Sequence, residues 1–310
     1  MVMRTLHDVP APAKLNLFLH IVGRRDDGYH LLQSVFVLID WCDRLHFELR
    51  SDGRLSRHDL GAALPDDDLC LRAANSLQSA SSCTLGADIS IDKQVPWGAG
   101  LGGGSSDAAS TLLALNRLWG LHWPRDRLMA LGLSLGADVP FFIGGHNAFV
   151  EGIGERLTPL PVPPLWLAVL KPAAGVQTRA LFASPLLVRD SEAVILEGLS
   201  ADVSESVALA LDGFGRNDMQ PAAEASCAEV AQAASLLHSR FGNSRMTGSG
   251  SAVFARAGKV VENSVGPSAV MTPEMTPEMT PEMPSRLPAG WVGRMCRSLE
   301  SHPLVGWVQD

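Results

Sequence analysis

The sequence predicts an α+β protein with two lobes, and three observations lead to this fold class. Strand-like and helix-like segments both occur, but they do not alternate as regularly as a doubly wound sheet requires. The pattern of strands, helices and small-residue turns begins again near residue 172. The 310 residues, 46% of them hydrophobic, are enough for one large domain or two ordinary ones. We therefore expect a first lobe over residues 1–171 and a second over residues 172–310.

The first lobe begins with predicted strands. Residues 11–22 alternate in part between apolar and polar side chains, and residues 34–40 form an apolar run rich in Val and Ile. Residues 88–92 alternate as Asp-Ile-Ser-Ile-Asp and predict a third strand. A helix should begin near Ser105, because Ser and Asp suit a first turn, and Gly120 can end it. We expect a further helix over residues 125–135 and strands over 148–150 and 165–170.

The second lobe should contain helical segments over residues 178–181 and 227–240, followed by a strand over 252–255. A true repeat interrupts this lobe, because Met-Thr-Pro-Glu occurs three times between Met271 and Glu282. A proline at every fourth position forbids a regular helix. We therefore predict a low-complexity surface insertion near residues 264–287.

Composition restricts the partners and the compartment. The formal net charge of −8 offers no broad positive field, so we expect neither a nucleic-acid nor a membrane partner, and an anionic ligand must be held by local groups. The five cysteines are an odd number and form no C-x-x-C pair, which is typical of a reducing compartment. The N-terminus lacks the long apolar core of a signal peptide. These observations predict a soluble cytoplasmic protein.

A glycine-rich loop carries the strongest functional signal. Five glycines lie within the seven positions 98–104, between a predicted strand and a predicted helix. Glycine accepts positive φ and has no side chain, so successive backbone N–H groups can converge on an anion near a helix N-terminus. The sequence therefore predicts a phosphate site. Its candidate residues are Pro96, Gly98, Ala99, Gly100, Leu101, Gly102, Gly103, Gly104, Ser105 and Ser106.

Several kinds of glycine-rich loop are candidates for this segment. A Walker A loop ends in Gly-Lys-Ser/Thr, and this loop has no lysine at that place. A dinucleotide-binding fold needs an acidic residue at the end of the next strand about 20 residues on, and the candidate, Asp126, lies in a predicted helix. A plain flexible turn is the bland alternative. The loop alone thus indicates a phosphate but does not separate a kinase from a dehydrogenase.

Motifs outside the loop favour one family. The loop, Pro12-Ala13-Lys14-Leu15-Asn16, Asp27-Gly28-Tyr29-His30, Gly136-Ala137-Asp138-Val139-Pro140-Phe141 and Thr247-Gly248-Ser249-Gly250-Ser251 together resemble the GHMP kinases. The resemblance is closest to the branch that acts on a cytidine diphosphate derivative of methylerythritol in the non-mevalonate isoprenoid pathway. It extends over roughly residues 10–255 and fades beyond.

The resemblance implies a GHMP kinase fold, with an N-terminal lobe that has a ribosomal-protein-S5-like layer and a C-terminal α/β sandwich lobe. It implies ATP-dependent phosphorylation of a substrate hydroxyl, with Mg²⁺ accompanying ATP. Lys14 and Asp138 match the family's catalytic residues. Without the resemblance, Lys14 would be read as a solvated surface lysine and Asp138 as a helix cap. A carboxylate can take the hydroxyl proton, and an ammonium can balance phosphate charge.

The resemblance also implies a substrate pocket, in which Tyr29 and His30 match the element that binds cytidine. One departure from the family concerns Asp68, because the family usually has asparagine at this position bordering the adenine. The histidines show no ligand spacing, so we expect no structural metal. The complete set of implied substrate residues is Asn16, Tyr29, His30, Phe36, Thr178, Phe182, Thr247 and Gly248.

Two alternatives stay open on the sequence. Another GHMP-type kinase, acting on homoserine, mevalonate or galactose, would share the glycine loop but not Asp-Gly-Tyr-His together with Gly-Ala-Asp-Val-Pro-Phe. A nucleotide-binding sensor without turnover would be favoured if Lys14 or Asp138 were absent, and both are present.

Overall fold

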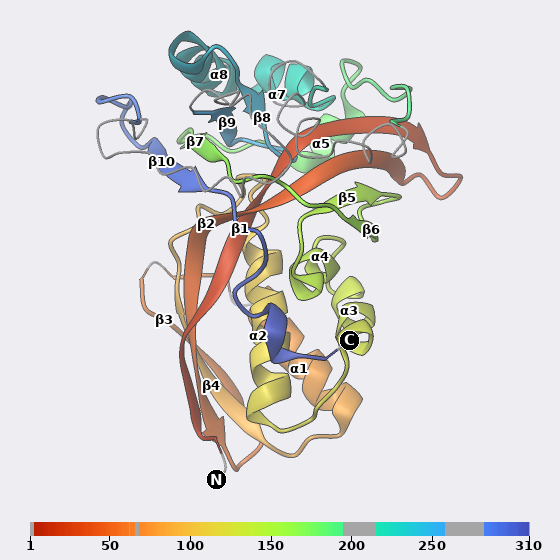
Figure 1. Ribbon diagram of the computed structural model, residues 1–310, viewed down its shortest axis with the longest axis vertical. Coiled ribbons are helices and arrows are strands. Elements are labelled where there is room, and N and C mark those ends of the chain that lie inside the picture. Colours follow the sequence, from red (N-terminus) through yellow and green to blue (C-terminus); the bar gives the residue numbers. More distant parts are fainter. Residues whose placement is uncertain (1–2, 62, 66–67, 195–214, 258–281, 310) are drawn as a thin grey trace, which may run out of the picture.

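The computed structural model describes residues 3–61, 63–65, 68–194, 215–257 and 282–309. Within these residues the chain forms a six-stranded sheet and a four-stranded sheet with helices packed on them (Figure 1). The first sheet has the strand order β3-β4-β2-β5-β6, with β1 paired to β2. The second sheet has the order β10-β7-β9-β8. The predicted α+β class is confirmed.

Two long antiparallel strands, β1 (Thr5–Arg24) and β2 (His30–Arg50), run most of the length of the molecule (Figure 1). Both extend well beyond the predicted ranges, because each passes from one hydrophobic core into the next. In β1, Ala11 belongs to the core under the first sheet, Leu15 to a middle core, and Ile21 to the core of the second sheet. Burial on both faces explains why apolar alternation marked only part of each strand.

Four strands complete the first sheet, and two of them, β4 and β5, lie where the sequence predicts strands. Strand β4 (Gly86–Asp92) confirms the predicted strand over 88–92, and it pairs in parallel with β3 (Leu55–Asp59), which the sequence did not predict. Strand β5 (Ala148–Glu151) pairs with β2 and with β6 (Arg156–Pro159).

Helices cover one face of this sheet (Figure 1). Helix α2 (Gly103–Leu118) begins two residues before the predicted start, and it is buried along most of its length between the sheet and α1 (Leu69–Ser81). Its small side chains permit this close packing. Helix α3 (Arg125–Leu133) confirms the predicted helix, and α4 (Val139–Gly144) follows it after a short connection.

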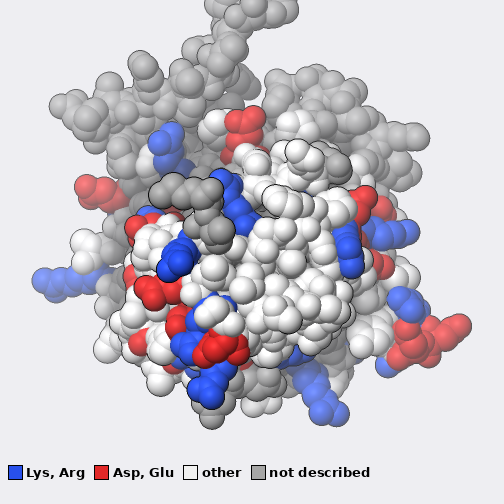
Figure 2. All heavy atoms as spheres, turned by 90° about the horizontal axis from the view of Figure 1, so that it is seen from below, with Lys and Arg blue, Asp and Glu red and all other residues white. Residues whose placement is uncertain are grey.

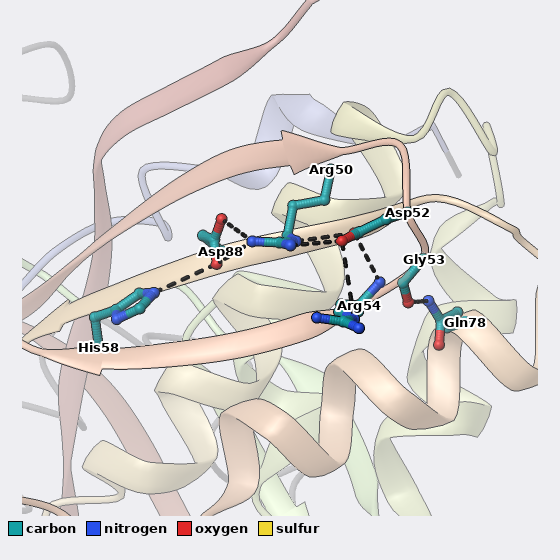
Figure 3. Close-up of polar contacts among 7 residues, drawn as sticks. All are labelled: Arg50, Asp52, Gly53, Arg54, His58, Gln78 and Asp88. Atoms are coloured by element: carbon teal, nitrogen blue, oxygen red, sulfur yellow. Dashed lines mark hydrogen bonds and ion pairs between the residues drawn. The ribbon is translucent and has the colours of Figure 1, made fainter.

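A polar network holds together the end of the sheet that lies far from the glycine loop (Figure 3). Arg50 of β2 donates hydrogen bonds to Asp88 of β4 and to Asp52 in the turn that follows, so one guanidinium joins two carboxylates. Gln78 of α1 donates to the carbonyl of Gly53, which ties the helix to the same turn. Contacts of this kind at the surface contribute little stability individually.

The second sheet consists of β7 (Trp166–Lys171), β8 (Arg245–Met246), β9 (Val253–Arg256) and β10 (Val292–Arg297). Helices α7 (Gln220–Ser226) and α8 (Ala228–Phe241) lie over it, and α5 (Thr178–Ala183) follows β7 (Figure 1). Strands β7 and β9 and helices α5 and α8 agree with the predicted positions to within a few residues.

The chain returns to the first lobe at its C-terminal end. Arg125 of α3 donates to the carbonyls of Val305 and Val308, and Leu304 is buried in the core under the first sheet. The short 3₁₀ helix η3 (Val305–Trp307) lies in this segment. The lobe boundary at residue 171 stays a prediction, and β7, which ends there, belongs to the second sheet. Most of the predicted insertion, including residues 271–281 of the repeat, lies outside the described residues.

Charges of both signs are mixed on the surface at the N-terminal end of the molecule. Figure 2 shows Lys and Arg side chains beside Asp and Glu side chains there, with a broad uncharged area between them. Across the described ranges, no helix combines the length and the apolar character that crossing a membrane would need.

Candidate active site

Lys14 and Asn16 lie on the same face of β1, because side chains two residues apart in a strand point the same way. Both are buried, and Lys14 is only 3% exposed. The Nζ of Lys14 donates to Oδ1 of Asn16 at 2.6 Å and lies 4.6 Å from the centre of the Phe36 ring. Phe36 is directly opposite Asn16 in the β1–β2 register. The strand pair alone thus brings three predicted site residues together.

Asp138 reaches this group from the start of α4. Its Oδ2 lies 3.6 Å from the Nζ of Lys14, and its side chain is 30% exposed. The helix begins at Val139 with Pro140 in its first turn, but the Asp138 carboxylate makes no capping hydrogen bond. The carboxylate is therefore available to Lys14 and to solvent. Neither the solvated-lysine interpretation nor the helix-cap interpretation describes these two side chains.

Burial determines the electrostatics of Lys14. Loss of water lowers the pKa of the Lys14 ammonium below its usual value of 10.5, and the negative charge of Asp138 partly opposes this shift. The ammonium therefore lies in a region where a second negative group, such as a phosphate, would be strongly attracted.

The glycine-rich loop packs directly on this pair. The backbone N–H of Lys14 donates to the carbonyl of Leu101 at 2.9 Å. Gly102 has φ +72, and a Cβ there would lie 3.0 Å from the Phe142 ring and 3.1 Å from Cγ of Lys14. Gly102 is thus needed for positive φ, as the sequence predicts for this loop, and also for the close approach of Phe142 and Lys14, which the sequence did not predict.

The loop alternates between anchored and open residues. The side chains of Ala99 and Leu101 are buried in the middle core and fix the loop to the sheet. Gly98 has φ +65 and no atom within 4 Å of a Cβ built there, so this part of the loop is open. The exposed backbone of Gly98 and Gly104 is free to meet a ligand, as the phosphate prediction requires.

The start of α2 supplies further donors. The first N–H groups of a helix have no partner within the helix, and the N-terminus carries partial positive charge. The hydroxyl of Ser106 is buried in the first turn and has no hydrogen-bond partner among the described residues. Buried polar atoms normally have a hydrogen-bond partner, so this hydroxyl is a candidate to bond an oxygen atom of a ligand. Ser105 lies beside it and is half-buried.

The small-residue loop from the second lobe closes on the same place. Thr247 is buried, and its Oγ1 accepts from the backbone N–H of Asn16 at 2.9 Å. A Cβ on Gly100 would lie 2.2 Å from the Thr247 carbonyl, and one on Gly248 would lie 2.9 Å from the Gly100 carbonyl. The two glycine-containing loops therefore touch backbone to backbone, which only glycine allows.

Aromatic residues form a second part of the site. The rings of His30 and Phe182 stack with centroids 4.7 Å apart and planes 22° apart. Tyr29 is 60% exposed beside them. Burial, followed by the charges of Arg189 and Arg24, lowers the pKa of His30, and its Nε2 has no hydrogen-bond partner among the described residues.

Thr178 joins the aromatic part to the small-residue loop over residues 247–251, since its hydroxyl lies 2.7 Å from that of Ser249. The structure thus gathers the predicted residues into two neighbouring groups, one around Lys14 and the glycine loop and one around His30.

Asp68 does not carry a free carboxylate. It caps α1 by accepting from the backbone N–H of Leu71 at 2.8 Å, and it forms a buried ion pair with Arg57. The departure from the family's asparagine therefore comes with a partner that neutralises its charge.

Sequence reasoning missed residues that hold the site together. The hydroxyl of Ser34 accepts from Nδ2 of Asn16 at 3.0 Å and donates to the carbonyl of Phe18. Nδ2 of Asn217 donates to the carbonyls of Met246 and Gly248. A serine within the apolar run over 34–40 was a signal for the first of these, and nothing in the sequence marked the second.

Comparisons with known proteins agree with this geometry. The family described as GHMP kinases N terminal domain matches residues 68–146, and the family described as GHMP kinases C terminal matches residues 196–263. A 4-diphosphocytidyl-2-C-methyl-D-erythritol kinase from Methylibium petroleiphilum is 65% identical over 308 residues, covering 99% of this chain and all of the relative. The same kinase from Albidiferax ferrireducens is 52% identical, covering 99% of this chain and 96% of the relative.

Solved structures give the same result. A crystal structure of 4-(cytidine 5'-diphospho)-2C-methyl-D-erythritol kinase matches with a TM-score of 0.69 and 35% identity, over 80% of this chain and 89% of that one. A homoserine kinase from Cytophaga hutchinsonii matches with a TM-score of 0.62 but 18% identity, over 83% and 86% of the two chains, which shows a shared fold alone. This chain therefore belongs to the 4-diphosphocytidyl-2-C-methyl-D-erythritol kinase branch of the GHMP kinases.

Proposed function

We propose that this chain transfers the γ-phosphoryl group of ATP to the 2-hydroxyl of 4-diphosphocytidyl-2-C-methyl-D-erythritol, a step in the formation of isoprenoid precursors. One observation carries the proposal. The buried ammonium of Lys14 lies 3.6 Å from the Asp138 carboxylate, and the backbone N–H of Lys14 donates a hydrogen bond to the glycine loop. A proton acceptor, a cation and a phosphate-binding loop thus meet in one place.

The chemistry follows from these groups. Asp138 accepts the proton of the substrate hydroxyl while the hydroxyl oxygen forms a bond to the γ-phosphorus. The bond between that phosphorus and the bridging oxygen breaks, and ADP leaves with the electron pair. The Lys14 ammonium balances negative charge on the transferring group. Its hydrogen bond to Asn16 at 2.6 Å holds it in place for this task.

The triphosphate lies against the glycine loop and the start of α2 in this proposal. Backbone N–H groups and the helix N-terminus attract phosphate oxygens. Mg²⁺ accompanies ATP and neutralises phosphate charge when bound. The unpartnered Ser106 hydroxyl fits this role, since Mg²⁺ prefers oxygen ligands and takes few from the protein in nucleotide sites.

The cytidine half of the substrate lies at the aromatic group. The stacked His30 and Phe182 rings and the exposed Tyr29 ring offer flat surfaces to a pyrimidine, and ring stacking adds to the free energy of binding beyond area alone. The unpartnered Nε2 of His30 can make a hydrogen bond to the edge of the base.

The same proposal places the chain in the cytoplasm, working on dissolved small molecules without a membrane or nucleic-acid partner. The net charge of −8 supports this, as do free thiols at the five cysteines.

A coupled assay for ADP release tests the proposal. The purified chain with ATP and Mg²⁺ is given 4-diphosphocytidyl-2-C-methyl-D-erythritol, homoserine, mevalonate or galactose in parallel. We expect turnover with the cytidine compound alone. Preferred turnover of one of the other three would replace the substrate assignment, and ATP binding without turnover of any would favour a sensor.

A further inference from the structure

A buried lysine lies between two buried carboxylates beside the glycine loop. The Nζ of Lys93 donates to Oδ2 of Asp43 and, at 2.5 Å, to Oδ2 of Asp107. Asp43 is fully buried, and the other two side chains are nearly so. We call Asp43, Lys93 and Asp107 the brace. Neither the proposed reaction nor the substrate site uses any of the three.

The brace joins the two ends of the loop. Oδ1 of Asp43 accepts from the backbone N–H groups of Gln94 at 2.6 Å and Val95 at 2.7 Å, the residues that lead into the loop. Asp107 lies in the second turn of α2, which leads out of it. Lys93 therefore links the chain before the loop to the helix after it, and Asp43 on β2 fixes both to the sheet.

The brace also lies against the first residue of α2. A Cβ on Gly103 would lie 3.2 Å from the Nζ of Lys93 and 3.2 Å from Cγ1 of Val95. The helix start that is proposed to face the triphosphate thus rests on the lysine. A shift of Lys93 would move the donors at the start of the helix.

Stability alone is a poor reason for this arrangement. Burying an ammonium and two carboxyl groups carries a large desolvation cost, and well-packed apolar residues of similar volume often give equal or greater stability. Oδ1 of Asp107 and Oγ1 of Thr111, one turn further along α2, have no hydrogen-bond partner among the described residues, which adds to the cost. What the ionic arrangement provides is a fixed direction and distance between the groups that it joins.

We propose that the brace formed by Asp43, Lys93 and Asp107 positions the glycine loop for ATP, so that these three are positioning residues for nucleotide binding. This inference rests on the proposed function in one respect, that the loop binds the phosphates of ATP. It is independent of which alcohol receives the phosphoryl group.

The test compares the brace with a matched cluster. Asp43→Asn and Asp107→Asn each keep the side-chain shape and replace a carboxyl group that accepts from Lys93 by an amide. The control, Asp88→Asn, changes one of the two carboxylates that flank Arg50 at the far end of the same sheet (Figure 3). For each variant we would measure ATP affinity by calorimetry, the KM for ATP, the KM for the alcohol substrate, kcat and the midpoint temperature of thermal unfolding.

We expect the brace variants to weaken ATP binding by about tenfold or more, because small displacements of positioning groups have effects of that size. The KM for the alcohol substrate and the kcat at saturating ATP should stay within about twofold of the parent values. The control should match the parent in all kinetic values. The double variant Lys93→Met/Asp43→Asn should weaken ATP binding no further than the stronger of the two single variants, Lys93→Met and Asp43→Asn. The effects should not add, because both changes disrupt the same set of contacts.

Two results would overturn the inference. One is unchanged ATP affinity in folded brace variants, even with a lowered thermal midpoint. The other is an equal rise in both KM values, which indicates general loosening of the fold. A parent protein that binds ATP but does not phosphorylate the cytidine compound would contradict the proposed function and leave the brace to be judged on ATP affinity. A parent that does not bind ATP would contradict both.

Discussion

The Nζ of Lys14 lies 3.6 Å from Oδ2 of Asp138, although one residue belongs to the long strand β1 and the other to the start of a short helix. The lysine is buried and the aspartate is partly exposed, so only the aspartate side of the pair is accessible to solvent. A substrate hydroxyl can approach the carboxylate from solvent while the ammonium stays fixed by Asn16. This asymmetry is what a proton acceptor with a fixed counter-charge needs.

Replacing Asp138 by asparagine should separate binding from chemistry. The change removes the proton acceptor and keeps the side-chain shape, so we expect ATP affinity near the parent value and turnover lower by about 10²-fold or more. Calorimetry and the ADP-release assay measure the two. Asp126→Asn in the exposed first turn of α3 is the control and should change neither. Retention of most turnover in Asp138→Asn would remove Asp138 from its assigned role.

Lys14 should give the activity an alkaline limit. Burial lowers its pKa below 10.5, so the ammonium loses its proton at a lower pH than an exposed lysine does. Turnover that needs the charge should therefore fall as pH rises toward this lowered pKa. A guanidinium stays protonated, so Lys14→Arg should show a lower maximum but no such fall. A pH profile of kcat between pH 7 and pH 10 measures this, and an unchanged alkaline limb in the arginine variant would exclude Lys14 as its source.

The sequence predicted the parts of the fold that carry local signals. Alternation identified β4, and the glycine loop and serines identified the start of α2. Helix α1 was missed, although its buried residues Cys70, Ala73, Ala74 and Leu77 have helical spacing that a closer reading of the periodicity would have found. Strands β3 and β8 are short and are held mainly by pairing to their neighbours, so their sequences carry little signal of their own.

The site was predicted through motifs, and what the motifs left out depends on tertiary contacts. Lys14 and Asn16 share a face of β1 by simple alternation, but the contact of Asn16 with Thr247 joins segments more than 200 residues apart. The link from Asp43 through Lys93 to Asp107 likewise depends on how β2 and α2 pack. Charged residues of this kind look like ordinary surface residues until the fold buries them.

Gly102 should tolerate a methyl group much less well than Gly98. Both have positive φ, so alanine is strained by about 1 kcal/mol at either position. At Gly102 the new Cβ also meets the Phe142 ring and the Lys14 stem, whereas at Gly98 it meets open space. Overpacking adds about 1–3 kcal/mol. Urea unfolding of the two alanine variants should show the larger loss of stability for Gly102→Ala, and equal losses would contradict the packing around Lys14.

Phe182 should matter for the cytidine substrate and not for ATP. Its ring stacks on His30, 4.7 Å away, in the part of the site proposed for the base. Phe182→Leu keeps an apolar side chain but removes the flat surface, so we expect the KM for the cytidine substrate to rise by about tenfold with the KM for ATP unchanged. Phe241→Leu at the end of α8 is a matched change outside the site. A rise in the KM for ATP alone would show that Phe182 contacts ATP and not the cytidine substrate.

Asp107 should make the protein less stable as pH rises. Burial raises its pKa from 3.8 to about 8, against the opposing charge of Lys93 and with the added repulsion of Asp43. Between these two pKa values the folded chain binds more protons than the unfolded chain, so the free energy of unfolding falls as pH increases. Asp107→Asn cannot ionise and should flatten this fall, as urea unfolding at intervals from pH 5 to pH 8 would measure.

The control for this prediction is Asp52→Asn, since the pKa of the Asp52 carboxyl group is shifted in the opposite direction. Its hydrogen bond to Arg50 lowers the pKa of Asp52 to about 2, so its contribution is lost only in acid and the slope above pH 5 should stay as in the parent. The same slope in Asp107→Asn and the parent would show that Asp107 is ionised throughout this range, with the brace carrying a net negative charge beneath the loop.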